Sequence, residues 1–124
     1  MLFEEDLTHS IRGALIGVHR ALGPGLLESA YEQCLCHELT LRGLAFERQV
    51  DLPIRYKGVL LDCGYRMDVV VEGRVLLELK SVDAIHPIHE AQTLTYLKIS
   101  GLRIALLVNF NVPKIVDGIK RIAH

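Results

Sequence analysis

Residues 73–80 read Gly73-Arg74-Val75-Leu76-Leu77-Glu78-Leu79-Lys80, an aliphatic run that ends in an acid and a lysine two positions apart. A second aliphatic run, residues 67–71, comes just before it and contains Asp68. Both runs are rich in residues that favour strands, and Glu72-Gly73 separates them. The pattern therefore predicts a β-hairpin.

The register of this hairpin decides where its charged side chains lie. A two-residue turn would pair Asp68 with Leu77 and direct the acid toward the core. A three-residue loop, residues 71–73 with Gly73 left-handed in a bulge, instead pairs Asp68 with Leu76. Asp68, Glu78 and Lys80 then share one face, because side chains alternate along a strand. The apolar pattern favours this second arrangement, since a slip of one residue would bury the charges.

Two carboxylates and a lysine on one sheet face require an explanation. Like charges a few ångströms apart raise one another's pKa unless a positive charge lies between them. A divalent cation with oxygen ligands, Mg²⁺ or Mn²⁺, would supply that charge, and Lys80 would then orient a water or stabilise a negatively charged transition state. The alternative is an ordinary ion pair between Asp68 and Lys80 on a solvated face. The spacing alone favours the ion pair, because such short motifs match by chance.

The composition bounds the class of protein. The 124 residues predict one domain, residues 1–124, and a hydrophobic content of 50% is enough for a proper core. A net charge of −1 argues against a strong non-specific binder of duplex nucleic acid, although it is compatible with a local positive groove. Three cysteines without a framework spacing indicate a reducing compartment. The longest run without charged side chains, residues 104–113, is too short to span a membrane, so we expect a cytoplasmic protein.

Apolar spacing arranges the chain in the order α-α-β-β-β-α-β, an α/β fold with a mixed sheet flanked by helices. Gly23-Pro24-Gly25 separates the first two helices, and the third has Pro87 at its start and Gly101 after its end. The apolar run after Gly101 is typical of a strand buried on both faces and parallel to a neighbour. The expected helices are 7–22, 26–42 and 88–99, the expected strands are 46–56 with a kink at Pro53, 59–71 with a bulge at Cys63-Gly64, 73–80 and 102–110, and the tail 112–124 is a short strand or a helical turn.

Four more residues stand out by their positions. Glu28 lies in the first turn of the second helix, where a carboxylate is the expected partner of the helix dipole, and this interpretation is the simpler one. Gln92 and Tyr96 are four residues apart and share a stripe on the third helix, which also fits a surface residue and a residue at the core margin. Arg66 precedes Asp68 by two residues and would share its face, so contact with a phosphate and an ordinary surface position are both open.

The order of these motifs resembles the core of the PD-(D/E)XK nuclease superfamily, which has a helix, a three-stranded meander with Asp and then Glu-x-Lys, a helix and a fourth strand. The sequence Gly25-Leu26-Leu27-Glu28-Ser29-Ala30-Tyr31 also resembles the motif for which the GxxExxY family is named. The likeness extends over about residues 7–122. The other matching segments are residues 18–25, 64–68, 77–80, 92–97 and 106–110.

This resemblance implies a role for each matching residue. Asp68 and Glu78 correspond to the metal-binding carboxylates, and the backbone carbonyl of Leu79 corresponds to a further ligand. Lys80 corresponds to the catalytic lysine. Glu28 corresponds to an additional acid that contacts the metal directly or through water.

Gln92 and Tyr96 correspond to a helix motif that supports the site and contacts the nucleic-acid backbone in some of these nucleases. Met67 stands where the superfamily name has proline, a common departure. The resemblance therefore implies a Mg²⁺- or Mn²⁺-dependent nuclease that hydrolyses phosphodiester bonds, with DNA favoured over RNA. The alternative is a nuclease-like fold that serves as a non-catalytic nucleic-acid-binding or protein-assembly module, as a homodimer or as a subunit of a larger assembly. No membrane partner is expected.

Overall fold

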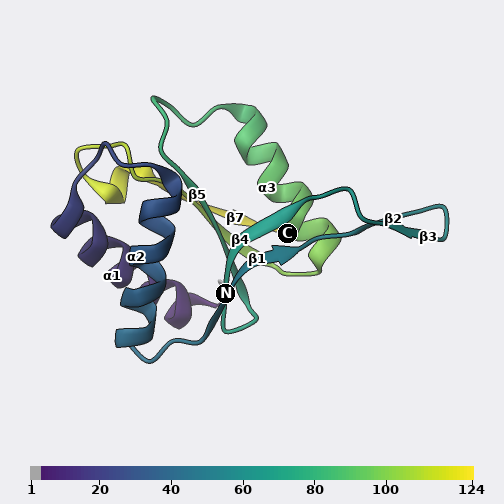
Figure 1. Ribbon diagram of the computed structural model, residues 1–124, viewed down its shortest axis with the longest axis horizontal. Helices are drawn as coiled ribbons and strands as arrows, with labels where there is room; N and C mark the ends of the chain where they lie inside the picture. Colours follow the sequence, from purple (N-terminus) through teal and green to yellow (C-terminus); the bar gives the residue numbers. More distant parts are fainter. Residues whose placement is uncertain (1–3) are drawn as a thin grey trace.

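The computed structural model describes residues 4–124 (Figure 1). Two helices come first, strands follow, and a third helix precedes the last strands, which confirms the expected α/β order. The helices are α1 (Glu5–Leu22), α2 (Glu28–Leu41), α3 (Pro87–Ser100) and the 3₁₀ turn η1 (Ile115–Gly118). The strands are β1 (Phe46–Asp51), β2 (Ile54–Tyr56), β3 (Val59–Leu61), β4 (Arg66–Val71), β5 (Val75–Lys80), β6 (Ile104–Asn109) and β7 (Ile119–Ala123).

A five-stranded mixed sheet in the order β1-β4-β5-β6-β7 forms the middle of the molecule. β1, β4 and β5 pair antiparallel, as the meander predicted. β6 follows α3 and pairs parallel with β5, which confirms the crossover expected for the apolar run after Gly101. The tail contains both of the expected alternatives, because η1 leads into β7, which pairs antiparallel with β6.

Helices cover both faces of this sheet (Figure 1). α1 and α2 pack on one face through a core that includes Leu15, Tyr31 and Leu77, each with no accessible surface. α3 covers the other face, where Leu97 packs in a second core with Leu76. Adjacent residues of a strand thus enter different cores. All six residues of β6 are buried, which explains why its sequence is almost continuously apolar.

The hairpin of β4 and β5 has the predicted faces but not the predicted pairing. Leu76 lies opposite Val70, and not opposite Asp68, so the register is shifted by two residues. The loop consists of residues 72–74, and its first two residues have positive φ angles of 54° and 64°. Because the shift is even, each side chain keeps the face that the sequence predicted, and Asp68 remains on the same side of the sheet as Glu78.

The segment between β1 and β4 forms a separate arm, which corrects the expectation of two long continuous strands. β2 and β3 pair with each other in a two-stranded sheet, and the predicted turn at Lys57-Gly58 joins them. On the way out, Pro53 interrupts the strand because it has no amide hydrogen for the sheet. On the way back, the Asp62 carboxylate accepts the Gly64 amide at 3.0 Å, and Gly64 has a φ of 77°. The chain therefore turns at this point where a bulge was expected.

The boundaries of α3 are those expected from its terminal residues. Pro87 is its first residue, and Gly101 follows its end with a left-handed φ of 81°. α1 begins at Glu5, slightly earlier than expected. Within residues 4–124, every helix is too short or too polar to cross a lipid bilayer.

Candidate active site

Asp68 and Glu78 lie on neighbouring strands, and each carboxylate accepts a hydrogen bond from a backbone amide across the strand pair. The Glu78 Oε2 atom accepts from the Asp68 amide at 2.9 Å, and the Asp68 Oδ2 atom accepts from the Leu79 amide at 2.8 Å. The regular pairing of β4 with β5 stops one residue earlier, at Val69 and Leu77. The two carboxylates therefore take the place of main-chain acceptors where the strands separate.

The burial of two acids at one place is electrostatically unfavourable. Glu78 is 5% exposed, and burial together with repulsion from Asp68 raises its pKa to about 8. Burial is also the main cause that raises the pKa of Asp68, whereas the hydrogen bond from Leu79 and the charge of Lys80 lower it. An acid pair that retains a proton near neutral pH indicates a site that lacks positive charge.

Lys80 ends β5, two residues after Glu78, and is half-buried. Its charge lowers the pKa of both acids, although less than burial raises it. Its carbonyl accepts the Phe110 amide at 2.9 Å, which fixes this end of the strand against the end of β6. The structure thus brings the predicted residues Asp68, Glu78 and Lys80 together on one side of the sheet.

Glu28 reaches the same strand end from α2. It is the first residue of that helix, as predicted for a partner of the helix dipole, and its Oε1 atom accepts from the Ser81 amide at 3.3 Å. The Ser81 hydroxyl in turn donates to the Leu26 carbonyl at 2.6 Å. These two contacts connect the start of α2 with the end of β5. As a result, Glu28, Asp68 and Leu79 line one pocket of about 210 Å³.

Tyr31 explains why α2 begins at this point. Its hydroxyl donates to the Gly23 carbonyl at 2.5 Å and accepts from the Leu26 amide at 3.2 Å. Its fully buried ring stacks on Phe110, with 4.2 Å between the ring centroids and an interplanar angle of 7°. The tyrosine of the motif thus anchors the loop before α2, and Glu28, three residues earlier, faces the pocket.

Sequence analysis did not predict three residues that line this pocket, Ser29, Glu32 and Gln49, and the last two are the informative ones. Glu32 is 7% exposed and accepts hydrogen bonds from Arg48 at 2.9 Å and from Gln49 at 2.7 Å. Gln49 lies opposite Asp68 in the register of β1 and β4, and its φ of 48° costs a non-glycine residue about 1–3 kcal/mol. The spacing of four residues between Glu28 and Glu32 was an available signal. No feature of the sequence marks the unusual backbone of Gln49.

Gln92 and Tyr96 approach the acid pair from α3. The Gln92 Nε2 atom donates to the Tyr96 hydroxyl at 2.9 Å, and Tyr96 is 6% exposed. Burial is the main cause that raises the pKa of Tyr96, and the charges of Glu78 and Asp68 contribute to the increase. The hydroxyl therefore lies within electrostatic range of both acids. Contact of this pair with nucleic acid stays a prediction.

Arg66 forms an ion pair with an acid outside the acid pair. It is the first residue of β4, and its Nε atom forms an ion pair with Asp51 at 3.3 Å, in which both side chains are exposed. Strand alternation gives Arg66 the face of Asp68, as predicted, but the partner of its guanidinium is an acid at the base of the arm.

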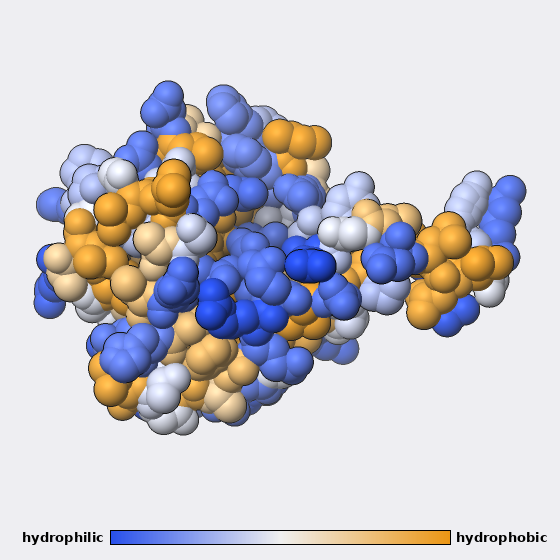
Figure 2. Space-filling model, viewed as in Figure 1, coloured by the Kyte–Doolittle hydropathy of each residue, from blue (hydrophilic) through white to orange (hydrophobic). Residues whose placement is uncertain are grey.

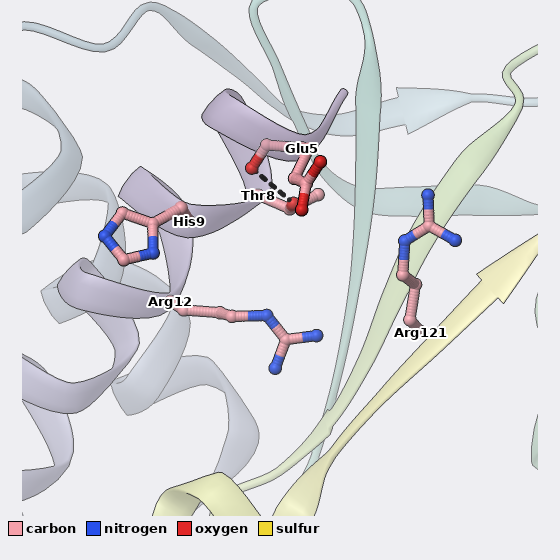
Figure 3. Close-up of a pocket in the computed structure, with 5 residues that line it drawn as sticks. All are labelled: Glu5, Thr8, His9, Arg12 and Arg121. Atoms are coloured by element: carbon pink, nitrogen blue, oxygen red, sulfur yellow. Dashed lines mark hydrogen bonds between the residues drawn. The ribbon is translucent and has the colours of Figure 1, made fainter. Parts of the chain in front are cut away.

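A second pocket, of about 200 Å³, lies between α1 and β7 (Figure 3). Arg12 and Arg121 enter it from these two elements, and the Thr8 hydroxyl on its wall donates to the Glu5 carbonyl at 2.9 Å. None of the predicted site residues lines this pocket. It holds a single carboxylate, that of Glu5, so it lacks the paired acids on which the candidate chemistry depends.

The fold and the site define a class of protein: a mixed sheet with two acids and a lysine where an antiparallel strand pair separates, and with a further acid on a preceding helix. Residues 5–122 match the family model of the PD-(D/E)XK nuclease superfamily. The match covers nearly the whole chain, and the protein therefore belongs to the PD-(D/E)XK nuclease superfamily. Comparison with curated proteins and with solved structures gave no match.

Nucleases of this superfamily typically use a divalent metal ion. Within residues 4–124, no group of three His, Cys, Asp or Glu side chains is close enough together to hold one. The chemistry of the donors nevertheless fits a hard cation, because Glu28, Asp68 and Glu78 offer carboxylate oxygens and Leu79 offers a carbonyl oxygen. Both acids of the buried pair accept backbone amides, so a cation would bind through exchange of these hydrogen bonds or through the remaining lone pairs.

Proposed function

We propose that the protein is a nuclease that hydrolyses phosphodiester bonds, in DNA in preference to RNA, at the site formed by Asp68, Glu78 and Lys80. The buried acid pair is the observation that carries this proposal. An ordinary cross-strand ion pair would be solvated and would lower the pKa of its acid. Both acids here have a raised pKa although Lys80 is nearby. A site with this excess of negative charge suits a divalent cation and a phosphate.

The resemblance to the superfamily suggests a role for each residue, and the position of each residue is compatible with that role. Asp68, Glu78 and the Leu79 carbonyl would hold Mg²⁺ or Mn²⁺, with Glu28 in contact directly or through water. When bound, the cation supplies charge neutralisation and lowers the pKa of a coordinated water. Lys80, at the open end of β5, orients the attacking water or stabilises the negative charge that develops on the phosphate.

The residues around the acid pair position these groups. Tyr96, which is hydrogen-bonded to Gln92, lies on α3 within electrostatic range of the acid pair, and the two side chains would offer hydrogen-bonding groups to a nucleic-acid backbone. Glu28 is placed by the contact between α2 and Ser81.

We further propose that the protein falls in the GxxExxY family within the superfamily. The separate roles of Glu28 and Tyr31 in one short motif support this assignment.

A second candidate function is a nuclease-like module that binds nucleic acid or a protein partner without cleavage. One observation favours it: among residues 4–124, the acids are not preassembled as a three-ligand group. Under this alternative the buried acid pair would be a remnant, and Lys80→Ala would abolish no cleavage because the protein would have none.

The test is a cleavage assay with labelled single-stranded, duplex and branched DNA and with RNA, in Mg²⁺ and in Mn²⁺, with EDTA as a blank. Lys80→Ala and Asp68→Ala should each abolish cleavage. The control is Lys98→Ala, which removes an exposed lysine from α3 and should cleave normally. Cleavage that survives Lys80→Ala and Asp68→Ala would show a contaminant, and cleavage of RNA alone would contradict the preference for DNA. No cleavage and no cation binding would favour the non-catalytic module.

A further inference from the structure

The arm formed by β2 and β3 is an unexplained feature of the fold. It extends away from the rest of the molecule, and its surface shows apolar residues close to its end (Figure 2). The side chains of Tyr56, Val59 and Leu60 are 52%, 55% and 56% exposed. An isolated two-stranded hairpin is marginally stable in water. The arm therefore has the properties of an element that acts by contact with another molecule.

The base of the arm is fixed beside the candidate active site. The Leu52 amide donates to the Tyr65 carbonyl at 2.9 Å, which closes the two chains of the base, and Leu52 is buried. The Tyr65 ring contacts Tyr96 edge to face, with 6.1 Å between centroids. Gln49, two residues before the end of β1, and Asp68, two residues after the start of β4, both line the pocket of the site. The arm thus leaves the sheet where the acid pair lies.

The two faces of the arm differ in chemistry. Tyr56 pairs with Val59 and Ile54 pairs with Leu61, so these four side chains share one face. Arg55 and its partner Leu60, which is exposed, lie on the opposite face. The Lys57 ammonium lies 5.4 Å from the centroid of the Tyr56 ring. The arm therefore offers an exposed aromatic ring with one cation next to it and another behind it.

The charge of the arm is opposite to that of the body. Residues 52–65, the segment between β1 and β4, contain two basic residues, Arg55 and Lys57, and one acid, Asp62, so their formal charge is +1. The whole chain has a net charge of −1, and the remainder of the chain therefore carries −2. A negatively charged strand near this protein is attracted to the arm more than to the body.

Two occupants are compatible with an exposed arm, a second copy of the protein and a single nucleic-acid strand. The contact area that each of them needs distinguishes the two. A stable contact between two copies of a protein buries about 800 Å² on each partner. The apolar face of the arm has only four side chains, and these are already partly covered. The arm alone therefore offers less than that area. A single nucleic-acid strand needs instead a few cations for phosphates and an aromatic ring for unpaired bases. The arm has both.

We propose that the β2–β3 arm holds the single-stranded part of a nucleic-acid substrate, with Arg55 and Lys57 on its phosphates and Tyr56 stacked on an unpaired base. This inference rests on the proposed nuclease function, since it assigns the substrate of the same site. Ten residues separate Gly58 at the tip from Asp68, which limits the reach of the arm to about 33 Å. At the axial rise of about 3.4 Å per nucleotide of a strand in B-DNA, this reach corresponds to at most about ten nucleotides, and an extended single strand covers it with fewer.

The test measures binding separately from cleavage. Fluorescence anisotropy follows labelled oligothymidylates of 3 and 20 nucleotides in the Lys80→Ala background, over a series of salt concentrations. The double variant Arg55→Gln/Lys57→Gln should weaken binding of the 20-mer about tenfold and remove its advantage over the 3-mer. Two lost phosphate contacts should also reduce the slope of log K against log salt by about 1.4. Tyr56→Ala should weaken binding about tenfold with little change in slope.

The matched control is Arg20→Gln/Lys114→Gln, which removes two exposed cations near η1 at the other end of the molecule (Figure 1). It should leave affinity and slope unchanged. An equal loss of affinity in the control would show that the arm variants act only through the general charge of the protein, which would overturn the proposal.

Unchanged binding in the arm variants would also overturn the proposal. A dimer in sedimentation that Tyr56→Ala dissociates, with DNA affinity unchanged, would identify a protein contact instead. Arm-dependent binding by a protein that cleaves no substrate would refute the nuclease function alone, and cleavage with arm-independent binding would refute the arm alone.

Discussion

Glu78 has the ionisation behaviour of a buried acid next to another acid. Its pKa is raised from 4.5 to about 8. At pH values between these two, the folded protein retains a proton that the unfolded chain has lost. Without a cation, the free energy of unfolding should therefore fall as pH rises from about 4.5 to about 8. The size of the loss is on the order of a few kcal/mol, and it is shared with Asp68 because the two acids interact.

Glu78→Gln should remove most of this pH dependence. Glutamine has the shape of the protonated acid and its oxygen can still accept the Asp68 amide, but it cannot ionise. In EDTA, urea unfolding between pH 5 and 9 should show a variant that is more stable than the natural protein at pH 8 and above. Glu47→Gln, which changes an exposed acid of β1, should keep the natural pH profile. Parallel profiles for Glu78→Gln and the natural protein would contradict the explanation.

Tyr31→Phe tests the residue that fixes the start of α2. The ring and its stacking on Phe110 would remain, but the Gly23 carbonyl and the Leu26 amide would lose their partner. We expect a loss of about 1–2 kcal/mol in the free energy of unfolding, measured with urea. Tyr56→Phe removes a hydroxyl from an exposed ring of the arm and should cost almost nothing. Equal effects of the two substitutions would show that the Tyr31 hydrogen bonds do not contribute to the free energy of unfolding.

At the scale of elements, the sequence predicted the faces of the hairpin better than its pairing. The positions of Asp68 and Glu78 on one side depend on whether the register is even or odd, which the apolar pattern determines. The loop lies at residues 72–74 and not at the predicted 71–73. Gly73 has the predicted left-handed backbone, but the left-handed backbone of Glu72 is not encoded in the apolar pattern. The arm was missed for a similar reason. Its residues have ordinary strand propensities, and only the breaks at Pro53 and Gly64 separate it from the main sheet.

The residues of the candidate site also divide into those that were predicted from the sequence and those that were missed. Asp68, Glu78 and Lys80 stood out because two acids and a lysine on one sheet face need an explanation, whereas their assignment to a metal site, and that of Glu28, came from the resemblance to the superfamily. Glu32 was missed because a buried acid on an apolar helix face is recognised only when its partner, Arg48 on β1, is known. That partnership joins residues 16 positions apart and depends on how α2 lies against the sheet.

Arg48 and Glu32 connect α2 with β1, and their contact should be measurable. Glu32 is almost completely buried, whereas the Arg48 side chain is 43% exposed. Arg48→Met should therefore lower the free energy of unfolding at pH 7 by about 1–2 kcal/mol, a value reduced for screening by solvent. The double variant Arg48→Met/Glu32→Gln should be more stable than the sum of the two single changes predicts, as a double-mutant cycle by urea unfolding would show. Strict additivity would mean that the ion pair contributes nothing.

At the scale of the whole molecule, cation binding should stabilise the fold and should depend on pH. A ligand that binds the folded state at 100 times its Kd adds about 2.7 kcal/mol, which for a chain of this length raises Tm by roughly 10 °C. The acid pair must lose a proton to accept a cation, so Mg²⁺ or Mn²⁺ at one fixed concentration should raise Tm more at pH 8 than at pH 6. Asp68→Asn should abolish the increase at both pH values, because it removes a ligand charge. Asp51→Asn, an exposed acid at the base of the arm, should leave the increase unchanged. An increase that is the same at both pH values, or that persists in Asp68→Asn, would place the cation elsewhere on the molecule and would separate the raised pKa of Glu78 from metal binding.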